Sequence, residues 1–147
     1  MSEISASIQA KCLAFSDRII KLNDYLLEQA SRKSYGKHPT SDIRRQTSRV
    51  PVHLQSVAAL ANQLLRSGTS IGANNAEATN AVSKTDYRAK SYIALKEARE
   101  SLYWIELLHR NNYIDDKQYQ SIYVDCEELV KLFVHRCKKI DDQIRED

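Results

Sequence analysis

One short segment of the chain has the composition of a phosphate-binding loop. Residues 68–72, with the sequence GTSIG, combine two glycines with two hydroxyl side chains. Glycine-rich loops can turn their backbone N–H groups toward phosphate oxygens, but such loops follow a strand and carry a Gly-Lys-Ser/Thr triplet. No strand pattern precedes this segment, and the triplet is absent. We therefore do not predict a nucleotide site here.

The cysteines and histidines give no stronger indication of catalysis. The chain has three cysteines, Cys12, Cys126 and Cys137, and no two of them form a Cys-x-x-Cys motif. Neither a zinc site nor a disulfide framework is therefore predicted. In a helical bundle, a di-metal site requires a Glu-x-x-His motif on each of two helices, and the chain lacks this repeat. No nucleophile–base pair has motif support. We expect no catalytic residue, no metal site and no cofactor, and hence no enzyme activity.

The elements that carry these residues are predicted to be long helices within one domain. The chain has 147 residues, with only three glycines and two prolines, which leaves few turns. It contains no run of about 20 apolar residues that could span a membrane. Residues 1–12 lack the basic start and apolar core of a secretory signal. With three cysteines and no disulfide pattern, we expect a cytoplasmic protein with no membrane partner.

Hydrophobic periodicity predicts four helices. The first helix has apolar residues in steps of four and three, at Ile8, Cys12, Phe15, Ile19, Leu22 and Leu26, with Leu13, Ile20 and Leu27 widening the stripe. The second begins near residues 52–57 and carries Val57, Leu60, Leu64, Ile71, Asn75, Ala78 and Val82. The third buries Leu95, Ala98, Leu102 and Ile105, beside Ala94, Ser101 and Leu108. The fourth has its seam at Tyr119, Ile122, Cys126, Leu129, Phe133 and Ile140.

Capping residues indicate where the later helices begin and end. Ser83 or Thr85 is expected to cap the third helix, and Asp115 or Asp116 the fourth. Residues 111–112 are both asparagine, which readily adopts the left-handed conformation that ends a helix. The short connections at 83–86 and 111–116 make the helices that they join antiparallel. The predicted fold is an all-α, antiparallel, up-down-up-down four-helix bundle.

The glycines of the second helix raise a question about its continuity. Gly68 and Gly72 lie four residues apart, so they share one helix face and could admit a neighbouring helix closely. Glycine inside a helix costs about 0.5–1 kcal/mol relative to alanine. We predict that close packing offsets this cost and that the helix is continuous. The alternative is a break at one glycine.

Two motifs resemble those of a known family. Residues 60–78 read LANQLLRSGTSIGANNAEA, and residues 92–108 read YIALKEARESLYWIELL. Together they resemble the bacterial four-helix-bundle family known as the 23S ribosomal RNA intervening-sequence proteins. The resemblance implies a homo-oligomer, typically a pentameric ring. A related branch comprises accessory proteins of diversity-generating retroelements, which bind nucleic acid and a reverse transcriptase. RNA or DNA and such an enzyme are therefore the partners that the resemblance implies.

A basic segment distinguishes this chain from the family pattern, in which the first connection is usually short. We predict one domain, residues 1–147, with a basic insertion at about 31–53. This insertion holds six cations against Asp42, a charge of +5, while the whole chain carries +3. The predicted nucleic-acid-binding residues are Arg32, Lys33, Lys37, Arg44, Arg45 and Arg49. Guanidinium groups pair with phosphate oxygens in a fork. The alternative is a solvated linker whose charges keep an oligomer in solution.

The third helix has a second apolar stripe besides its core stripe. Ile93, Trp104 and Leu107 are rotated by about 100–180° from that core stripe on a helical wheel. A four-helix monomer cannot easily bury both stripes, so we predict that these residues form an oligomer interface. In the alternative interpretation, Trp104 fills the edge of the monomer core.

Two functions remain open from the sequence. The first is a non-catalytic, pentameric scaffold that binds RNA or DNA through the basic insertion, as an accessory to a nucleic-acid enzyme. The second is a purely structural or protein-interaction module without nucleic-acid binding. Within the bundle, we expect Arg66 to pair with Glu97 or Glu100 and so to fix the register of two helices.

Overall fold

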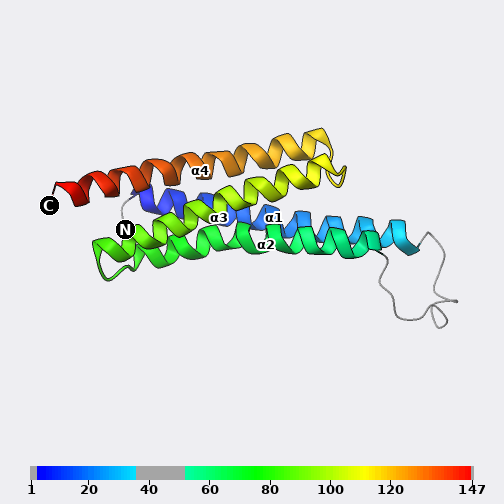
Figure 1. Ribbon diagram of the computed structural model, residues 1–147, viewed down its shortest axis with the longest axis horizontal. Helices are drawn as coiled ribbons and strands as arrows, with labels where there is room; N and C mark the ends of the chain where they lie inside the picture. The colour runs from blue at the N-terminus through cyan, green and yellow to red at the C-terminus, as the bar shows by residue number, and fades with distance from the viewer. Residues whose placement is uncertain (1–2, 36–51, 147) are drawn as a thin grey trace.

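The computed structural model describes residues 3–35 and 52–146, and these residues form an all-α structure (Figure 1). The four helices are α1 (Glu3–Tyr35), α2 (Val52–Thr79), α3 (Lys84–Arg110) and α4 (Asp116–Arg145). They pack lengthwise into an elongated four-helix bundle, which confirms the predicted all-α class. No strand occurs in the described ranges. Within the same ranges, no helix combines the length and apolar sequence that a membrane span needs.

Helix α2 runs through both glycines without a break, as predicted. A Cβ atom added to Gly68 would lie 2.9 Å from Ile19 Cγ1, and one added to Gly72 would lie 3.3 Å from Cys12 Cβ. Both neighbours belong to the buried seam of α1. The two glycines therefore let α1 and α2 approach more closely than side chains would permit, and this packing offsets the helix-propensity cost.

The ends of α3 and α4 follow the predicted caps. The Ser83 hydroxyl accepts a hydrogen bond from the Asp86 backbone N–H, 3.1 Å away. Asp115 caps α4 and forms a capping box with Gln118. Of the two asparagines between these helices, Asn112 has a φ of 58° and Asn111 does not adopt the left-handed conformation. The turn between α3 and α4 thus depends on the left-handed Asn112 and on the cap at Asp115.

The core is formed by the predicted seams of all four helices. The fully buried large side chains include Phe15, Ile19, Leu64, Ile71, Ile105, Leu108, Leu129 and Phe133. Cys12, Cys126 and Cys137 are free and buried, as predicted. Burial raises the pKa of Cys12 to about 11 and that of Cys126 to about 12, because a thiolate is poorly solvated there. The cysteines act as small apolar residues.

Three of the predicted core positions are wrong. Leu13 and Ile20 are 57% and 44% exposed. Both lie more than about 100° from the seam of α1 on a helical wheel, and no other helix of the bundle covers that face. Val82 is 93% exposed, because α2 ends at Thr79 and leaves Val82 in the connection to α3. Leu27 is half-buried.

Consecutive helices are also neighbours in space. The pairs α1–α2, α2–α3 and α3–α4 pack extensively, α1 and α4 touch at fewer positions, and the backbones of α1 and α3 do not approach each other closely. Along the α1–α2 pair, Cys12 lies against Gly72, and Ile19, further along α1, lies against Gly68. The two chain ends lie near one end of the bundle, and the α3–α4 connection lies near the other (Figure 1).

Candidate functional site

The predicted nucleic-acid-binding residues fall partly outside the described structure. Lys37, Arg44, Arg45 and Arg49 belong to residues 36–51, which the structure does not describe. Arg32 and Lys33 lie in the last turn of α1, and both are exposed. The Arg32 guanidinium donates to Glu28 one turn earlier, with an Nη2–Oε1 distance of 2.5 Å. The nucleic-acid role of all six residues stays a prediction.

The surroundings of Lys33 place the basic end of α1 beside the α3–α4 connection. Lys33 and Tyr113 line the same small hollow, together with Leu26, Gln29, Ala30 and Val57. Arg110, in the last turn of α3, is exposed and forms a weak pair with Glu106, 3.6 Å away. Cations from the last turns of α1 and α3, Lys33 and Arg110, therefore lie at the end of the bundle where α1 ends and the basic segment continues.

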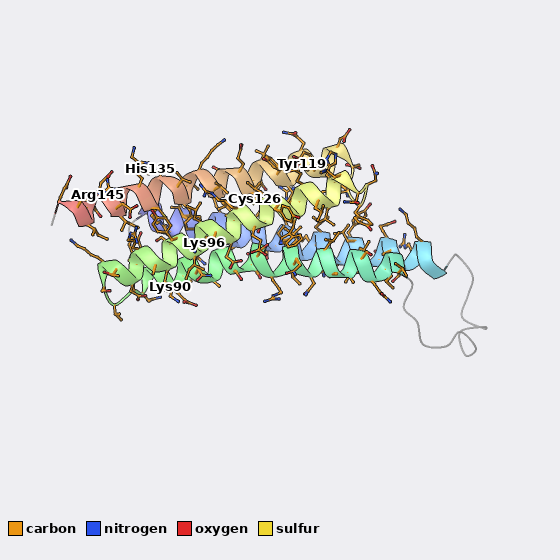
Figure 2. The ribbon with its side chains drawn as sticks, viewed as in Figure 1. Lys90, Lys96, Tyr119, Cys126, His135 and Arg145 are labelled. Carbon is orange, nitrogen blue, oxygen red and sulfur yellow. The ribbon has the colours of Figure 1, made fainter. Side chains whose placement is uncertain are left out.

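The predicted interface residues belong to α3, and none of them is among its buried residues. Figure 2 shows the side chains along the bundle. Ile93 is 37% exposed, whereas Trp104 and Leu107 are half-buried. Trp104 packs against the core, and its indole N–H donates to Glu100 at 3.0 Å. Tyr103, beside it, contacts the indole edge-on at 4.9 Å and is 58% exposed. The tryptophan therefore both fills the edge of the core and contributes to an outer apolar surface. Its role in assembly stays a prediction.

The expected pairing of Arg66 is not present within the described residues. No ion pair joins Arg66 to Glu97 or to Glu100. Partial burial, followed by repulsion from Glu100, raises the pKa of Glu97, and the attraction of Arg66 offsets only part of this rise.

Other polar contacts join α2 to α3 instead. The Ser101 hydroxyl donates to the Ser67 hydroxyl at 2.9 Å in the buried interior, and Lys90 forms an ion pair with Glu77.

A second buried polar cluster was not predicted. Arg136 is 8% exposed, and its guanidinium donates to Asn75 Oδ1 at 2.5 Å. The Asn75 amide in turn donates to Gln9, so one contact chain joins α1, α2 and α4. The Arg136 guanidinium also lies 5.1 Å from the centre of the Phe133 ring. The sequence signal was the position of Arg136, three residues after Phe133, which places it on the seam of α4.

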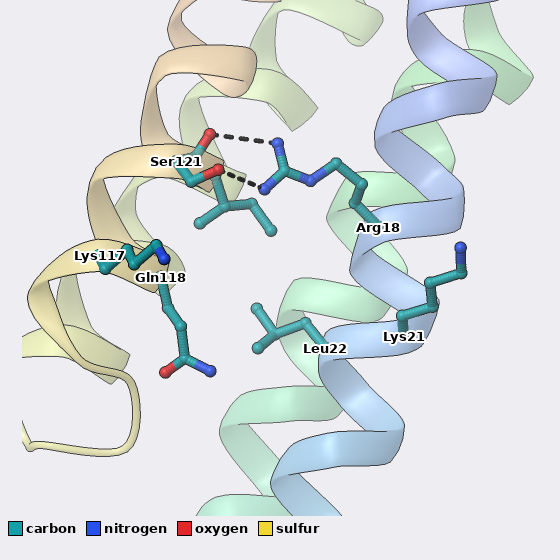
Figure 3. A pocket seen from close by; sticks show the side chains of 7 residues that line it. Arg18, Lys21, Leu22, Lys117, Gln118 and Ser121 are labelled. Atoms are coloured by element: carbon teal, nitrogen blue, oxygen red, sulfur yellow. Dashed lines mark hydrogen bonds between the residues drawn. The ribbon is translucent and has the colours of Figure 1, made fainter.

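A groove between α1 and α4 was also missed (Figure 3). Its volume is about 460 Å³, and Leu22 and Ile122 form its apolar floor. Lys21 and Lys117 line it from opposite helices, and neither has an ion-pair partner among the described residues. No local motif marks this groove, because its walls come from opposite ends of the sequence.

Arg18 fastens one side of this groove. Its guanidinium donates to the Ser121 hydroxyl at 2.8 Å and to the Ser121 carbonyl at 3.2 Å (Figure 3). It also pairs with Asp125. The charge of Arg18 is therefore compensated, and its polar atoms are used to join α1 to α4. The groove therefore presents the cations of Lys21 and Lys117 beside apolar surface.

The described residues hold no group of three potential metal ligands. Glu106 and His109 have the Glu-x-x-His spacing once, but Glu106 faces Arg110, and His109 Nε2 lies 2.7 Å from Asp116. A single motif whose members have other partners is not a di-metal site.

Comparisons with known proteins extend over most of the chain. The family model of the 23S rRNA-intervening sequence protein matches residues 36–135, so the match begins inside the basic segment. A crystal structure from Bacteroides thetaiotaomicron VPI-5482, of a protein with unknown function from the S23 ribosomal protein family, is 36% identical. Its TM-score is 0.72, and the similarity covers 92% of this chain and 98% of that one. A search of curated proteins found no match. The chain belongs to the family of 23S rRNA-intervening sequence proteins.

Proposed function

We propose that this protein is a non-catalytic, homopentameric scaffold that binds RNA or DNA through the basic segment 31–53, as an accessory to a nucleic-acid enzyme. The observation that carries the proposal is the distribution of charge. The segment has a charge of +5, from six cations and Asp42, so the remaining residues together carry −2. A positive charge confined to one segment is suited to a phosphate backbone.

Features at the end of α1 support this assignment. Arg32 and Lys33 carry the positive charge of the segment onto the surface of the bundle. The Arg32–Glu28 pair is exposed, and such pairs contribute about 0.3–0.5 kcal/mol. Phosphate can therefore replace the carboxylate at small cost. In a ring, each subunit would present the same cations, and several weak contacts would act together.

The proposed assembly is a ring of antiparallel, up-down-up-down bundles. The opposed order of the contacts Cys12–Gly72 and Ile19–Gly68 supports the antiparallel arrangement of α1 and α2. The exposed apolar surface at Ile93 supports association of subunits.

The test of the proposal is the solution mass of the protein, measured by light scattering with a short structured RNA across a salt series. Removing one phosphate contact should reduce the slope of log K against log salt by about 0.7–0.9. We expect the triple variant R44E/R45E/R49E to bind more weakly and to lower the slope by about 2–3 for each segment that engages RNA.

The matched control is K138E/K139E/R145E, which changes the charge by the same amount on α4. This control should retain its RNA affinity more fully than the segment variant. Equal losses of affinity in both triple variants would mean that only net charge matters, and the segment would no longer have its assigned role.

A protein-interaction module without nucleic-acid binding is the second candidate function. The exposed Tyr103 beside the half-buried Trp104 favours it, because aromatic residues are enriched in protein interfaces. An oligomer that ignores RNA at low salt would support this candidate. The variant Trp104→Glu should yield helical monomers, and retention of the native mass would contradict the interface role of Trp104.

A further inference from the structure

The outer face of α1 carries an unusual ridge of alternating apolar and acidic residues. Leu13, Asp17, Ile20 and Asp24 are spaced by four, three and four residues, so they lie along one face of the helix. All four are exposed. Neither aspartate has an ion-pair partner in the described part of the chain. We call these four residues the α1 ridge.

The outer face of α3 carries a second ridge with the opposite charge. Ile93, Lys96 and Tyr103 are exposed and lie at spacings of three and seven residues, with Arg99 one helix turn from Tyr103. Lys96 and Arg99 are exposed and have no ion-pair partner within residues 3–35 and 52–146. We call these four residues the α3 ridge.

The two ridges cannot cover each other within one chain. The backbones of α1 and α3 do not approach each other closely, and all residues of both ridges are exposed to solvent. The bundle thus exposes two apolar ridges on different sides, one with two unpaired carboxylates and the other with two unpaired cations. Glu100, which is exposed and accepts the Trp104 indole N–H, lies on the same face of α3, so that face carries a smaller net positive charge than its two cations alone. Exposed apolar residues beside complementary charges are features of a protein interface.

We propose that the α1 ridge of one copy docks against the α3 ridge of a second copy. In this arrangement Asp17 and Asp24 lie near Lys96 and Arg99, while Leu13 and Ile20 are covered by the apolar residues of the α3 ridge. This inference rests on the proposed oligomeric scaffold and names the surfaces that assemble it. The interface predicted from the sequence contained only α3 residues. The present proposal adds the exposed residues of α1 to it.

Electrostatics selects this pairing over two symmetric alternatives. If α1 ridges met each other, four carboxylates would gather at one interface, and if α3 ridges met, four cations would gather there against the two carboxylates of Glu100. Juxtaposed like charges oppose association. A contact between two different surfaces is heterologous, and its repetition by rotation generates a closed ring or an open filament. The charges therefore favour the interface type that a ring requires.

Charge reversal tests the pairing directly. The variants D17K/D24K and K96E/R99E each place like charges at every interface. We expect both to lose assembly and to scatter light with the mass of one chain, 16.9 kDa. The variant with all four substitutions restores opposite charges with reversed sign and should recover the mass of the native oligomer. Far-ultraviolet circular dichroism verifies that each variant remains helical.

Mixing the two double variants provides a sharper outcome. Each interface between unlike variants has opposite charges, whereas each interface between identical variants has like charges. Only alternating arrangements are then favourable, and these close only with an even number of subunits. We expect the mixture to assemble into even-numbered rings or open chains, but not into the five-subunit ring proposed for the native protein.

Matched controls reverse exposed charges elsewhere on α4. The variants K138E/K139E and D142K/E146K change the same numbers of cations and carboxylates, and they should keep the native mass. Native mass in D17K/D24K or in K96E/R99E, or failure of the fourfold variant to reassemble, would overturn the pairing of the ridges.

The mass of the native protein separates this inference from the scaffold itself. If the native protein is oligomeric and only the pairing of the ridges fails, the scaffold stands and assembles through another surface. A native monomer would overturn both the pairing of the ridges and the oligomeric scaffold, and it would leave the two ridges for a different protein partner.

Discussion

The close contact of α1 and α2 at Gly68 makes a quantitative prediction. In Gly68→Ala, the new methyl group would lie 2.9 Å from Ile19 Cγ1 and 3.3 Å from Ile19 Cγ2. Ile19 is 1% exposed, and a β-branched side chain in a helix has essentially one favourable χ1 rotamer. The isoleucine therefore cannot turn away without displacing its buried neighbours.

The expected effect is a balance of two terms. Alanine gains about 0.8–1.0 kcal/mol in helix propensity over glycine, while overpacking a core costs about 1–3 kcal/mol. We expect Gly68→Ala to lower the free energy of unfolding by about 1 kcal/mol. In Gly72→Ala the nearest atom, Cys12 Cβ, is 3.3 Å away. The change there should be smaller, because the helices need to move apart by only a few tenths of an ångström.

The assay is urea unfolding followed by circular dichroism, at one protomer concentration for all variants, because assembly makes stability depend on concentration. A double-mutant cycle with Ile19→Ala isolates the contact. That variant alone should cost about 2–5 kcal/mol. In the double variant, Gly68→Ala with Ile19→Ala, the Cγ atoms that would clash are gone. Its destabilisation should therefore be smaller than the sum of the two single-variant values by about 1 kcal/mol or more. A Gly68→Ala protein that is more stable than the native one, with additive effects in the cycle, would refute the close-packing argument.

Three further outcomes follow from buried and paired groups. Because burial raises the pKa of Cys12 to about 11 and that of Cys126 to about 12, a disulfide reagent at pH 8 should modify both thiols far more slowly in the native protein than in denaturant. The hydrogen bond from Tyr92 is the largest cause that lowers the pKa of Asp141, so Tyr92→Phe should raise that pKa in an NMR titration. A lowered native pKa stabilises the fold above the unfolded value of about 3.9, and this contribution disappears as the pH falls through the native pKa. Asn75→Ala removes an acceptor from a buried guanidinium and should cost about 1.5–3 kcal/mol in urea unfolding.

The helices and their buried seams could be predicted from the sequence because each depends on local periodicity and caps. Cys12, Phe15 and Ile19 recur at helical spacing, and all three are buried. Ser83 and Asp115 cap the helices that follow them. These features require only the direction of a side chain on its own helix.

Features that depend on the neighbouring helix could not be predicted in the same way. A helical wheel gives the angle of Leu13 or Ile20 but does not indicate whether another helix covers that angle. Arg136 was not predicted to be buried, because a charged residue is normally assigned to the surface even at a seam position of α4. The groove beside Lys21 and Lys117 exists only because the first and last helices meet. The basic segment was visible as charge, but its four central cations lie outside the described residues.

The unequal packing of the helices has a consequence for how the chain folds. Every extensive helix pair joins consecutive helices, while α1 and α4 meet at fewer positions. Two of the contacts that close this seam are Lys11–Glu128 and Arg18–Asp125. Such ion pairs near the surface contribute about 0–1 kcal/mol each.

The native contacts are therefore mostly local in sequence, which gives a low contact order, and helical bundles of this kind fold in microseconds to milliseconds. The bundle can form by the successive packing of consecutive helices, and the α1–α4 seam can close last. The same seam has the fewest contacts to break, so α1 and α4 should separate in local opening before consecutive helices do.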